Sequence, residues 1–262
     1  MKILVIMGSP RKGNTYRAAE RIREVLQEKV LVEWEYVMLG DLDIAQCRGC
    51  LTCFSKGEEY CPLKDDIAGL EEKMQEADGV IFATPVYGMQ VSGLMKVFID
   101  RHSYIFHRPC FFRQKALLLT TTGVLGIRDV LDYLDTVARI WGLEVAARVG
   151  ITTGILHEER QKENDKRIVA AAEAFLDALQ RGSRSRPGFS DVMVFHGQRA
   201  TFDELGEEWS PADHSYWTDQ EWLEKGRRYF VDVPVNPIYH LIGTIMEWYL
   251  RRQTRKDLAK VA

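Results

Sequence analysis

The sequence predicts an α/β fold in which helices cover both faces of a five-stranded parallel sheet, followed by a C-terminal extension of different character. Short apolar runs alternate with segments whose apolar residues recur at helical spacing, which is typical of parallel sheets with helical crossovers. The first run, Ile3 to Ile6, has no polar break, as expected of a strand buried on both faces. After Phe189 the alternation stops and aromatic residues become frequent.

The order of the strands follows from their individual character. Strands are expected at residues 3–6, 32–38, 79–83, 116–120 and 145–151. The second alternates between polar and apolar residues, which predicts an edge strand with one more buried face. Parallel strands are joined by right-handed crossovers, so the wholly apolar first strand belongs inside the sheet. These features favour the doubly wound order 2-1-3-4-5.

The first expected strand leads into a loop rich in glycine and hydroxyl groups. The loop spans residues 8–13, and Asn14 or Thr15 could cap the helix that follows. Unpaired N–H groups and the positive end of a helix dipole would make this an anion site. No Lys follows Gly13 as in a Walker A motif, and G-x-G-x-x-G is missing. A single terminal phosphate is therefore favoured over a nucleotide diphosphate, and a turn without ligand is the alternative. The expected phosphate-binding residues are Ser9, Arg11, Gly13, Asn14 and Thr15.

Two further loops are expected at the same edge of the sheet, because ligands of doubly wound sheets sit at the carboxyl ends of the strands. Pro85 stiffens the loop after the third strand, Tyr87 offers a flat ring, and Gly88 lets a backbone N–H approach a ligand. The candidate residues in these loops are Pro85, Val86, Tyr87 and Gly88 after the third strand, and Thr121, Thr122 and Gly123 after the fourth.

With these three loops in order, residues 1–180 resemble the NADPH-dependent FMN reductase branch of the flavodoxin-like superfamily, on the stretches GSPRKGNT and PVYG. The resemblance implies a flavodoxin-like fold and FMN held by its phosphate in the first loop. The isoalloxazine would then lie between the other two loops, and NAD(P)H would be the co-substrate. No catalytic side chain is expected, because the flavin carries the chemistry.

Four of the five cysteines cluster in one short segment. Cys47, Cys50 and Cys53 stand at steps of three, and Cys61 follows with Pro62 after it. The ferredoxin run C-x2-C-x2-C-x3-C-P shares the first two steps and the proline, but its last gap is shorter. The motif resembles that of archaeal and bacterial iron–sulfur flavoproteins, which implies a [4Fe–4S] cluster on these four thiols. Zinc, a redox C-x-x-C disulfide, and thiols without metal remain alternatives.

The expected organisation has three parts. A flavodoxin-like FMN-binding domain covers residues 1–180 with the cysteine insertion at 40–64, a linker covers 181–188, and an extension covers 189–262. The extension has no alternating core pattern, so we expect an oligomerisation arm in a homodimer or homotetramer. Its last helix is expected to pack on its own core or on a sister subunit, and an interfacial membrane helix is the alternative. The apolar face of that helix contains Ile238, Leu241, Ile242, Ile245, Met246 and Tyr249.

Composition excludes several classes of protein. A hydrophobic content of 46% and a charged content of 28% are those of a globular protein. A net charge of −3 argues against a general nucleic-acid binder. The apolar stretch from Met1 to Met7 is too short for a signal peptide, and the apolar stretch 238–250 is too short to span a bilayer. We therefore expect a cytoplasmic protein with reduced thiols and no membrane partner.

The sequence thus predicts an FMN-dependent NAD(P)H oxidoreductase of the iron–sulfur flavoprotein type. It would pass electrons from a reduced donor through FMN and a [4Fe–4S] cluster to an unidentified small-molecule or protein acceptor. Alternatives are an electron carrier reduced by ferredoxin and a cluster-free NADPH-dependent FMN or quinone reductase. A third is an interaction module without flavin, whose fold a metal ion stabilises. The phosphate loop argues against the last. No nicotinamide-binding motif is present, so NAD(P)H follows from the resemblance alone.

Overall fold

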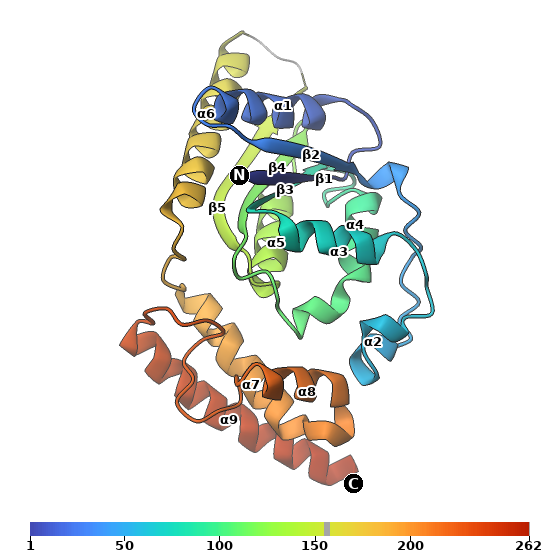
Figure 1. Ribbon diagram of the computed structural model, residues 1–262, viewed down its shortest axis with the longest axis vertical. Coiled ribbons are helices and arrows are strands. Elements are labelled where there is room, and N and C mark those ends of the chain that lie inside the picture. Colours follow the sequence, from blue (N-terminus) through green and yellow to red (C-terminus); the bar gives the residue numbers. More distant parts are fainter. Residues whose placement is uncertain (155–157, 262) are drawn as a thin grey trace. The chain divides into compact units, whose positions relative to one another are not determined.

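The computed structural model describes residues 1–154 and 158–261, and the chain divides into two compact units (Figure 1). The first unit comprises residues 1–47, 65–103 and 111–183. The second comprises residues 48–64, 104–110 and the chain from Arg184 onward. Most of the cysteine segment therefore groups with the C-terminal helices. Ala262, the last residue of the expected extension, lies outside the described residues.

The first unit is built on a five-stranded parallel sheet of order β2-β1-β3-β4-β5. Its strands are β1 (Lys2–Met7), β2 (Glu33–Met38), β3 (Gly79–Pro85), β4 (Lys115–Thr122) and β5 (Glu144–Thr152). The predicted flavodoxin-like sheet is therefore confirmed. Every residue of β3 and β4 is buried, as expected of inner strands covered on both faces, whereas β2 is an edge strand and only partly buried.

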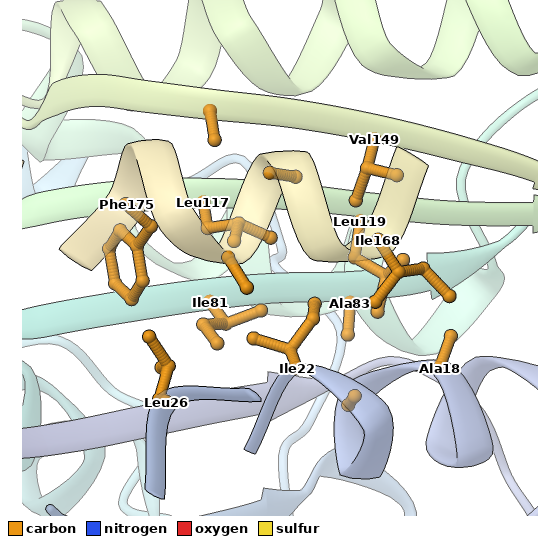
Figure 2. Close-up of a cluster of buried hydrophobic side chains, with 14 of the residues drawn as sticks. Ala18, Ile22, Leu26, Ile81, Ala83, Leu117, Leu119, Val149, Ile168 and Phe175 are labelled. Atoms are coloured by element: carbon orange, nitrogen blue, oxygen red, sulfur yellow. The ribbon is translucent and has the colours of Figure 1, made fainter. Parts of the chain in front are cut away.

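Helices cover both faces of this sheet (Figure 1). They are α1 (Asn14–Gln27) and α6 (Glu158–Arg181) on one face, and α3 (Ile67–Glu76), α4 (Gly93–Arg101) and α5 (Ile127–Ile140) on the other. Figure 2 shows Ile22 of α1, Phe175 of α6 and Ile81 of the sheet within one buried cluster. On the other face, Phe82 packs against Trp141 with ring centroids 6.1 Å apart. Burial on both faces is what makes the inner strands read as continuous apolar runs.

A buried ion pair joins the two chain segments that flank the cysteines. Arg101, from the last turn of α4, pairs with Asp65, and both side chains are 4% exposed. The N–H of Ala45 donates to Asp65 Oδ2 at 3.0 Å, and the Ala45 carbonyl accepts from Arg101 at 3.1 Å. Burial alone raises the pKa of Asp65, but the hydrogen bonds from Arg101 and Ala45 outweigh it and lower the pKa. The chain therefore leaves and re-enters the first unit at adjacent points.

The second unit is helical and has an aromatic core. Its helices are α2 (Thr52–Ser55), α7 (Phe189–Trp209), α8 (Pro211–Asp219) and α9 (Pro237–Val261), and short 3-10 turns occur at Leu39–Asp41, Glu58–Tyr60 and Ser103–Phe106 of the chain. Phe195, Trp217, Trp222 and Phe230 are each at most 5% exposed. The rings of Trp222 and Phe230 lie edge to face at 4.8 Å. The lack of strand–helix alternation after Phe189 therefore does not mean the lack of a core.

Helix α9 packs on α7 through polar residues. A Cβ at Gly243 would lie 2.2 Å from the His196 ring, so only glycine permits this approach. Glu247 is hydrogen-bonded to His196 Nδ1 at 2.6 Å, to Arg199 Nε at 3.0 Å and to Arg251 Nη2 at 2.8 Å. The residues of the expected apolar face are instead largely exposed. The expected apolar face of α9 therefore does not pack on the core of its own chain, because the charged network holds the opposite face of the helix against α7.

We expect the second unit to lose stability in acid because of Glu247. Burial raises the pKa of this carboxyl, but the hydrogen bonds from His196, Arg199 and Arg251 outweigh it and bring the pKa to about 2. The stabilisation is therefore complete above the ordinary glutamate pKa of about 4.3 and is lost as the pH falls toward 2. The shift corresponds to at most about 3 kcal/mol.

Thermal melts of Glu247→Gln, followed by circular dichroism, check this expectation. The variant should melt lower than the wild type at pH 7, and the difference should shrink between pH 5 and pH 2. Glu208→Gln, at an exposed position of α7, is the matched control. A constant difference across this pH range would contradict the assignment.

Candidate functional site

A cavity of about 160 Å³ opens at the carboxyl edge of the sheet in the first unit. Its walls are the loop after β1 with the first turn of α1, the ends of β3 and β4 with the residues that follow them, and one residue after β5. Pro85, Thr121 and Thr122, which we expected after their strands, are the last residues of β3 and β4. The lining residues are Ser9, Arg11, Gly13, Asn14, Thr15, Pro85, Val86, Tyr87, Thr121, Thr122, Gly123 and Thr153. The structure thus brings together eleven of the twelve residues proposed from sequence as cofactor-binding. Gly88 does not line the cavity, and Thr153 is an addition.

The loop between β1 and α1 is held tightly against its neighbours. Gly8 N donates to Ala83 O at 2.8 Å, and Ser92 Oγ donates to Gly8 O at 2.6 Å. A Cβ at Gly8 would lie 2.9 Å from Ser92 Oγ, so a side chain there would displace the loop. These contacts fix the position of the turn from which α1 begins.

The start of α1 differs from expectation in one respect. The helix begins at Asn14, so Asn14 and Thr15 lie in its first turn and Gly13 is the N-cap residue. No side-chain hydrogen bond caps this end, and its first turn contains no acidic residue. Glycine has no side-chain acceptor, so the first-turn N–H groups keep their capacity to bind an anion.

Buried hydroxyl groups complete the polar floor of the cavity. Thr15 Oγ1 and Thr121 Oγ1 lie 2.7 Å apart and link the first turn of α1 to the end of β4. Ser9 Oγ donates to the Arg11 carbonyl at 2.7 Å. The Arg11 side chain itself is exposed and adds positive charge at the cavity. Hydroxyl donors, helix N–H groups and a guanidinium are the groups that bind a phosphate.

Exposed apolar residues occur in the cavity lining and next to it in the chain. Tyr87 lines the cavity, and Met89, Val124 and Leu125 lie within two residues of a lining residue. These four residues, which we call the rim, are between 47% and 76% exposed. Tyr87 and Gln90 exchange backbone hydrogen bonds at 2.9 and 3.0 Å, which closes a tight turn containing Gly88 at φ +55°. A cavity of about 160 Å³ is smaller than the roughly 300–1,000 Å³ that encloses a whole organic ligand. It is large enough for a phosphate and its attached chain, but too small to enclose a whole organic ligand.

Sequence reasoning missed three rim or lining residues for different reasons. Thr153 N donates to Thr122 O at 2.7 Å, and Thr153 Oγ1 donates to the same carbonyl at 3.1 Å. Thr153 directly follows the last strand. The rule that ligands bind at the carboxyl ends of the strands, which we applied to three other strands, could therefore have identified it. Met89 and Leu125 carry no chemical signal in the sequence, because only their exposure and their closeness in the chain to lining residues distinguish them.

The four clustered cysteines differ in exposure. Cys47 and Cys50 are exposed, whereas Cys53 and Cys61 are half-buried, as is Cys110. Cys47 belongs to the first unit and the other three to the second. Within residues 1–154 and 158–261, no three Cys, His, Asp or Glu side chains are gathered closely enough to hold a metal ion. The chemistry of the donor set, four thiols in one segment, nevertheless suits an iron–sulfur cluster.

The backbone around Cys50 is sharply turned. Gly49 and Leu51 both have left-handed conformations, at φ 63° and 60°. The conformation is uncommon for leucine, and such strain often occurs at functional sites. Thr52 Oγ1 donates to Cys50 Sγ at 3.3 Å, and this hydrogen bond lowers the pKa of the Cys50 thiol. The segment is thus sharply curved around Cys50, and its thiol has a lowered pKa.

Arg108 anchors the cysteine segment within the second unit. Its Nη2 donates to the Cys53 carbonyl at 2.7 Å, and its Nη1 lies 2.8 Å from Glu58. Its Nε lies 3.2 Å from Asp213, which is fully buried on α8 and also hydrogen-bonded to His107 at 2.8 Å. No motif in the sequence marked Arg108 or Asp213. Their importance follows only from burial and from the long-range contact.

In the ranges that the structure describes, no helix has the length and apolar character needed to cross a membrane.

The sheet order and the loops gathered at its carboxyl edge define a protein of the flavodoxin-like class. Residues 1–153 match the family model described as NADPH-dependent FMN reductase. The chain belongs to this family and is an NAD(P)H-dependent flavin oxidoreductase. The resemblance read from GSPRKGNT and PVYG is thereby confirmed.

Relatives and a solved structure agree with this placement. The chain is 29% identical over 225 residues to an iron–sulfur flavoprotein of Archaeoglobus fulgidus, covering 85% of this chain and 100% of that one. It is 39% identical over 162 residues to an iron–sulfur flavoprotein of Methanocaldococcus jannaschii, covering 58% and 81%. An FMN-dependent NADH-azoreductase from Bacillus anthracis, solved with FMN, superposes with a TM-score of 0.51 at 16% identity, covering 66% and 98%. That last likeness shows the shared fold alone.

Proposed function

We propose that this chain binds FMN in the cavity of the first unit and transfers electrons from NAD(P)H to an acceptor. The observation that carries the proposal is the convergence of three loops, remote in sequence, on one cavity at the carboxyl edge of the sheet. Membership of the NADPH-dependent FMN reductase family supports the choice of cofactor.

The chemistry of the lining residues matches different parts of the cofactor. Asn14, Thr15 and the first-turn N–H groups of α1 would bind the phosphate, with Arg11 as the counter-charge. Tyr87 and the apolar rim would pack against the isoalloxazine and leave its outer face open to a second reactant. FMN, when bound, supplies the hydride and electron chemistry. The chain's own task is to hold, orient and partly shield it.

We further propose that Cys47, Cys50, Cys53 and Cys61 hold a [4Fe–4S] cluster. Thiolates are the ligands such clusters require, and the ferredoxin-like steps of three support the assignment. The left-handed residues on either side of Cys50 and the anchor from Arg108 to Cys53 keep the segment curved. The thiols would close around the cluster as it binds, because metal binding commonly completes the local fold.

Turnover kinetics separate the proposed enzyme from the alternatives. FMN-loaded protein should oxidise NADPH or NADH continuously in the presence of a quinone or free flavin. A protein that is reduced only by ferredoxin would be an electron carrier instead. Full turnover by iron-free protein would favour the cluster-free FMN or quinone reductase.

A further inference from the structure

Helix α9 has an apolar stripe that faces away from α7. The stripe contains Ile238, Leu241, Ile242, Ile245, Trp248 and Tyr249, which are between 41% and 65% exposed. The spacing 238–241–245–248 is the alternating three- and four-residue step of a coiled-coil seam. Such a seam fits the grooves of another helix.

The helix cannot rotate to bury this stripe within its own chain. Gly243 and Glu247 lie on the opposite face, and both are fixed on α7. Glu247 is 8% exposed at its side chain and bound to His196, Arg199 and Arg251. Turning α9 would separate Glu247 from His196 and Arg199 of α7, and Arg251 from Asp203 and Glu204 of α7. Breaking a buried charge network of this kind is strongly destabilising.

We propose that the apolar stripe of α9 is the docking surface for the same stripe of a second copy of this chain. At roughly half exposure each side chain leaves on the order of 100 Å² open, so the stripe offers about 600 Å². A stable interface needs about 800 Å² from each partner. Two stripes in contact therefore supply most of the area that a dimer requires.

The charges on α9 select an antiparallel pair. The face that is apolar up to Tyr249 continues with Arg252, Lys256 and Lys260. A parallel pair would set these cations against themselves, and like charges at such positions are destabilising. In an antiparallel pair Leu241 packs on Ile245 of the second copy. The cations then extend past the start of the partner helix and stay in water.

The molar mass in solution, measured by light scattering during size-exclusion chromatography, tests the proposal on the full-length protein. Ile245→Asp should halve the mass of the wild-type assembly while leaving the far-ultraviolet circular dichroism spectrum and the FMN content unchanged. Trp248→Ser is a second variant with the same expected result. Leu31→Asp, at a residue 94% exposed and outside α9, is the matched control.

Mixing charged variants tests the orientation. Leu241→Lys and Ile245→Asp, each dissociated alone, should regain the wild-type mass when mixed. Recovery only in a mixture of Ile245→Lys with Ile245→Asp would overturn the antiparallel arrangement. A monomeric wild type, or a mass that Ile245→Asp leaves unchanged, would overturn the proposal. The wild type could instead sediment with phosphatidylserine vesicles, and Ile245→Asp could abolish this sedimentation without changing the molar mass. That result would assign the stripe to a membrane surface.

Discussion

Replacing Asn14 and Thr15 together by alanine should weaken FMN binding by about 10²- to 10⁴-fold. Hydrogen bonds to a charged group contribute about 1.5–3 kcal/mol each, and two of them are removed. Both residues lie in the first turn of α1 and line the cavity. Quenching of flavin fluorescence during titration of the flavin-free protein gives the two dissociation constants.

Riboflavin makes this prediction specific to the phosphate. It lacks the phosphate, so its affinity should hardly differ between the wild type and the double variant. Thr136→Ala, at an exposed position of α5, should bind FMN like the wild type. A double variant that loses FMN and riboflavin equally would show a role in folding rather than in phosphate binding.

The second large effect is the loss of iron on removing a cysteine. Protein prepared without oxygen should contain iron and sulfide near four atoms each per chain, as in a [4Fe–4S] protein. Cys53→Ala should abolish the cluster, because it removes a central ligand of the run. Cys61→Ala should lower the iron to about three atoms or fewer, because Cys61 supplies the fourth corner after the longer gap. Colorimetric iron and sulfide assays measure both.

Two internal controls accompany the iron assay. Cys110→Ala, outside the clustered segment, should keep the wild-type iron content. FMN content should stay constant in all these variants, because none of the four cysteines lines the cavity. An intact cluster in Cys61→Ala would assign the fourth ligand to another residue. If iron-free wild-type protein oxidised NADPH at the full rate, the four cysteines would not hold a cluster that the activity requires.

The sheet was predictable because burial on both faces leaves a strong pattern in the sequence. Ile3 to Ile6 has no polar break, and this one feature places β1 inside the sheet. The cavity was predictable for a related reason. Once strands are placed, parallel topology brings their carboxyl ends to one edge, so Ser9, Tyr87 and Thr121 had to lie near one another.

The second unit was less predictable, because its contacts connect segments far apart in the chain. Trp217 Nε1 donates to the His107 carbonyl at 2.7 Å. No periodicity of apolar residues in the sequence predicts a contact between these two residues. The orientation of α9 was also hidden. A helix normally buries its apolar face, but in this chain Glu247 and Gly243 determine which face meets α7. A single buried carboxylate leaves no pattern that spacing alone can reveal.

Flavin stoichiometry tests most directly whether the cavity of the first unit holds FMN. The protein is incubated with excess FMN, freed of unbound flavin by gel filtration and boiled, and the flavin absorbance of the supernatant is compared with the protein concentration. We expect about one FMN per chain, released without covalent attachment. A supernatant without flavin absorbance would contradict this, because the cavity between β1, β3 and β4 would then have no cofactor to hold.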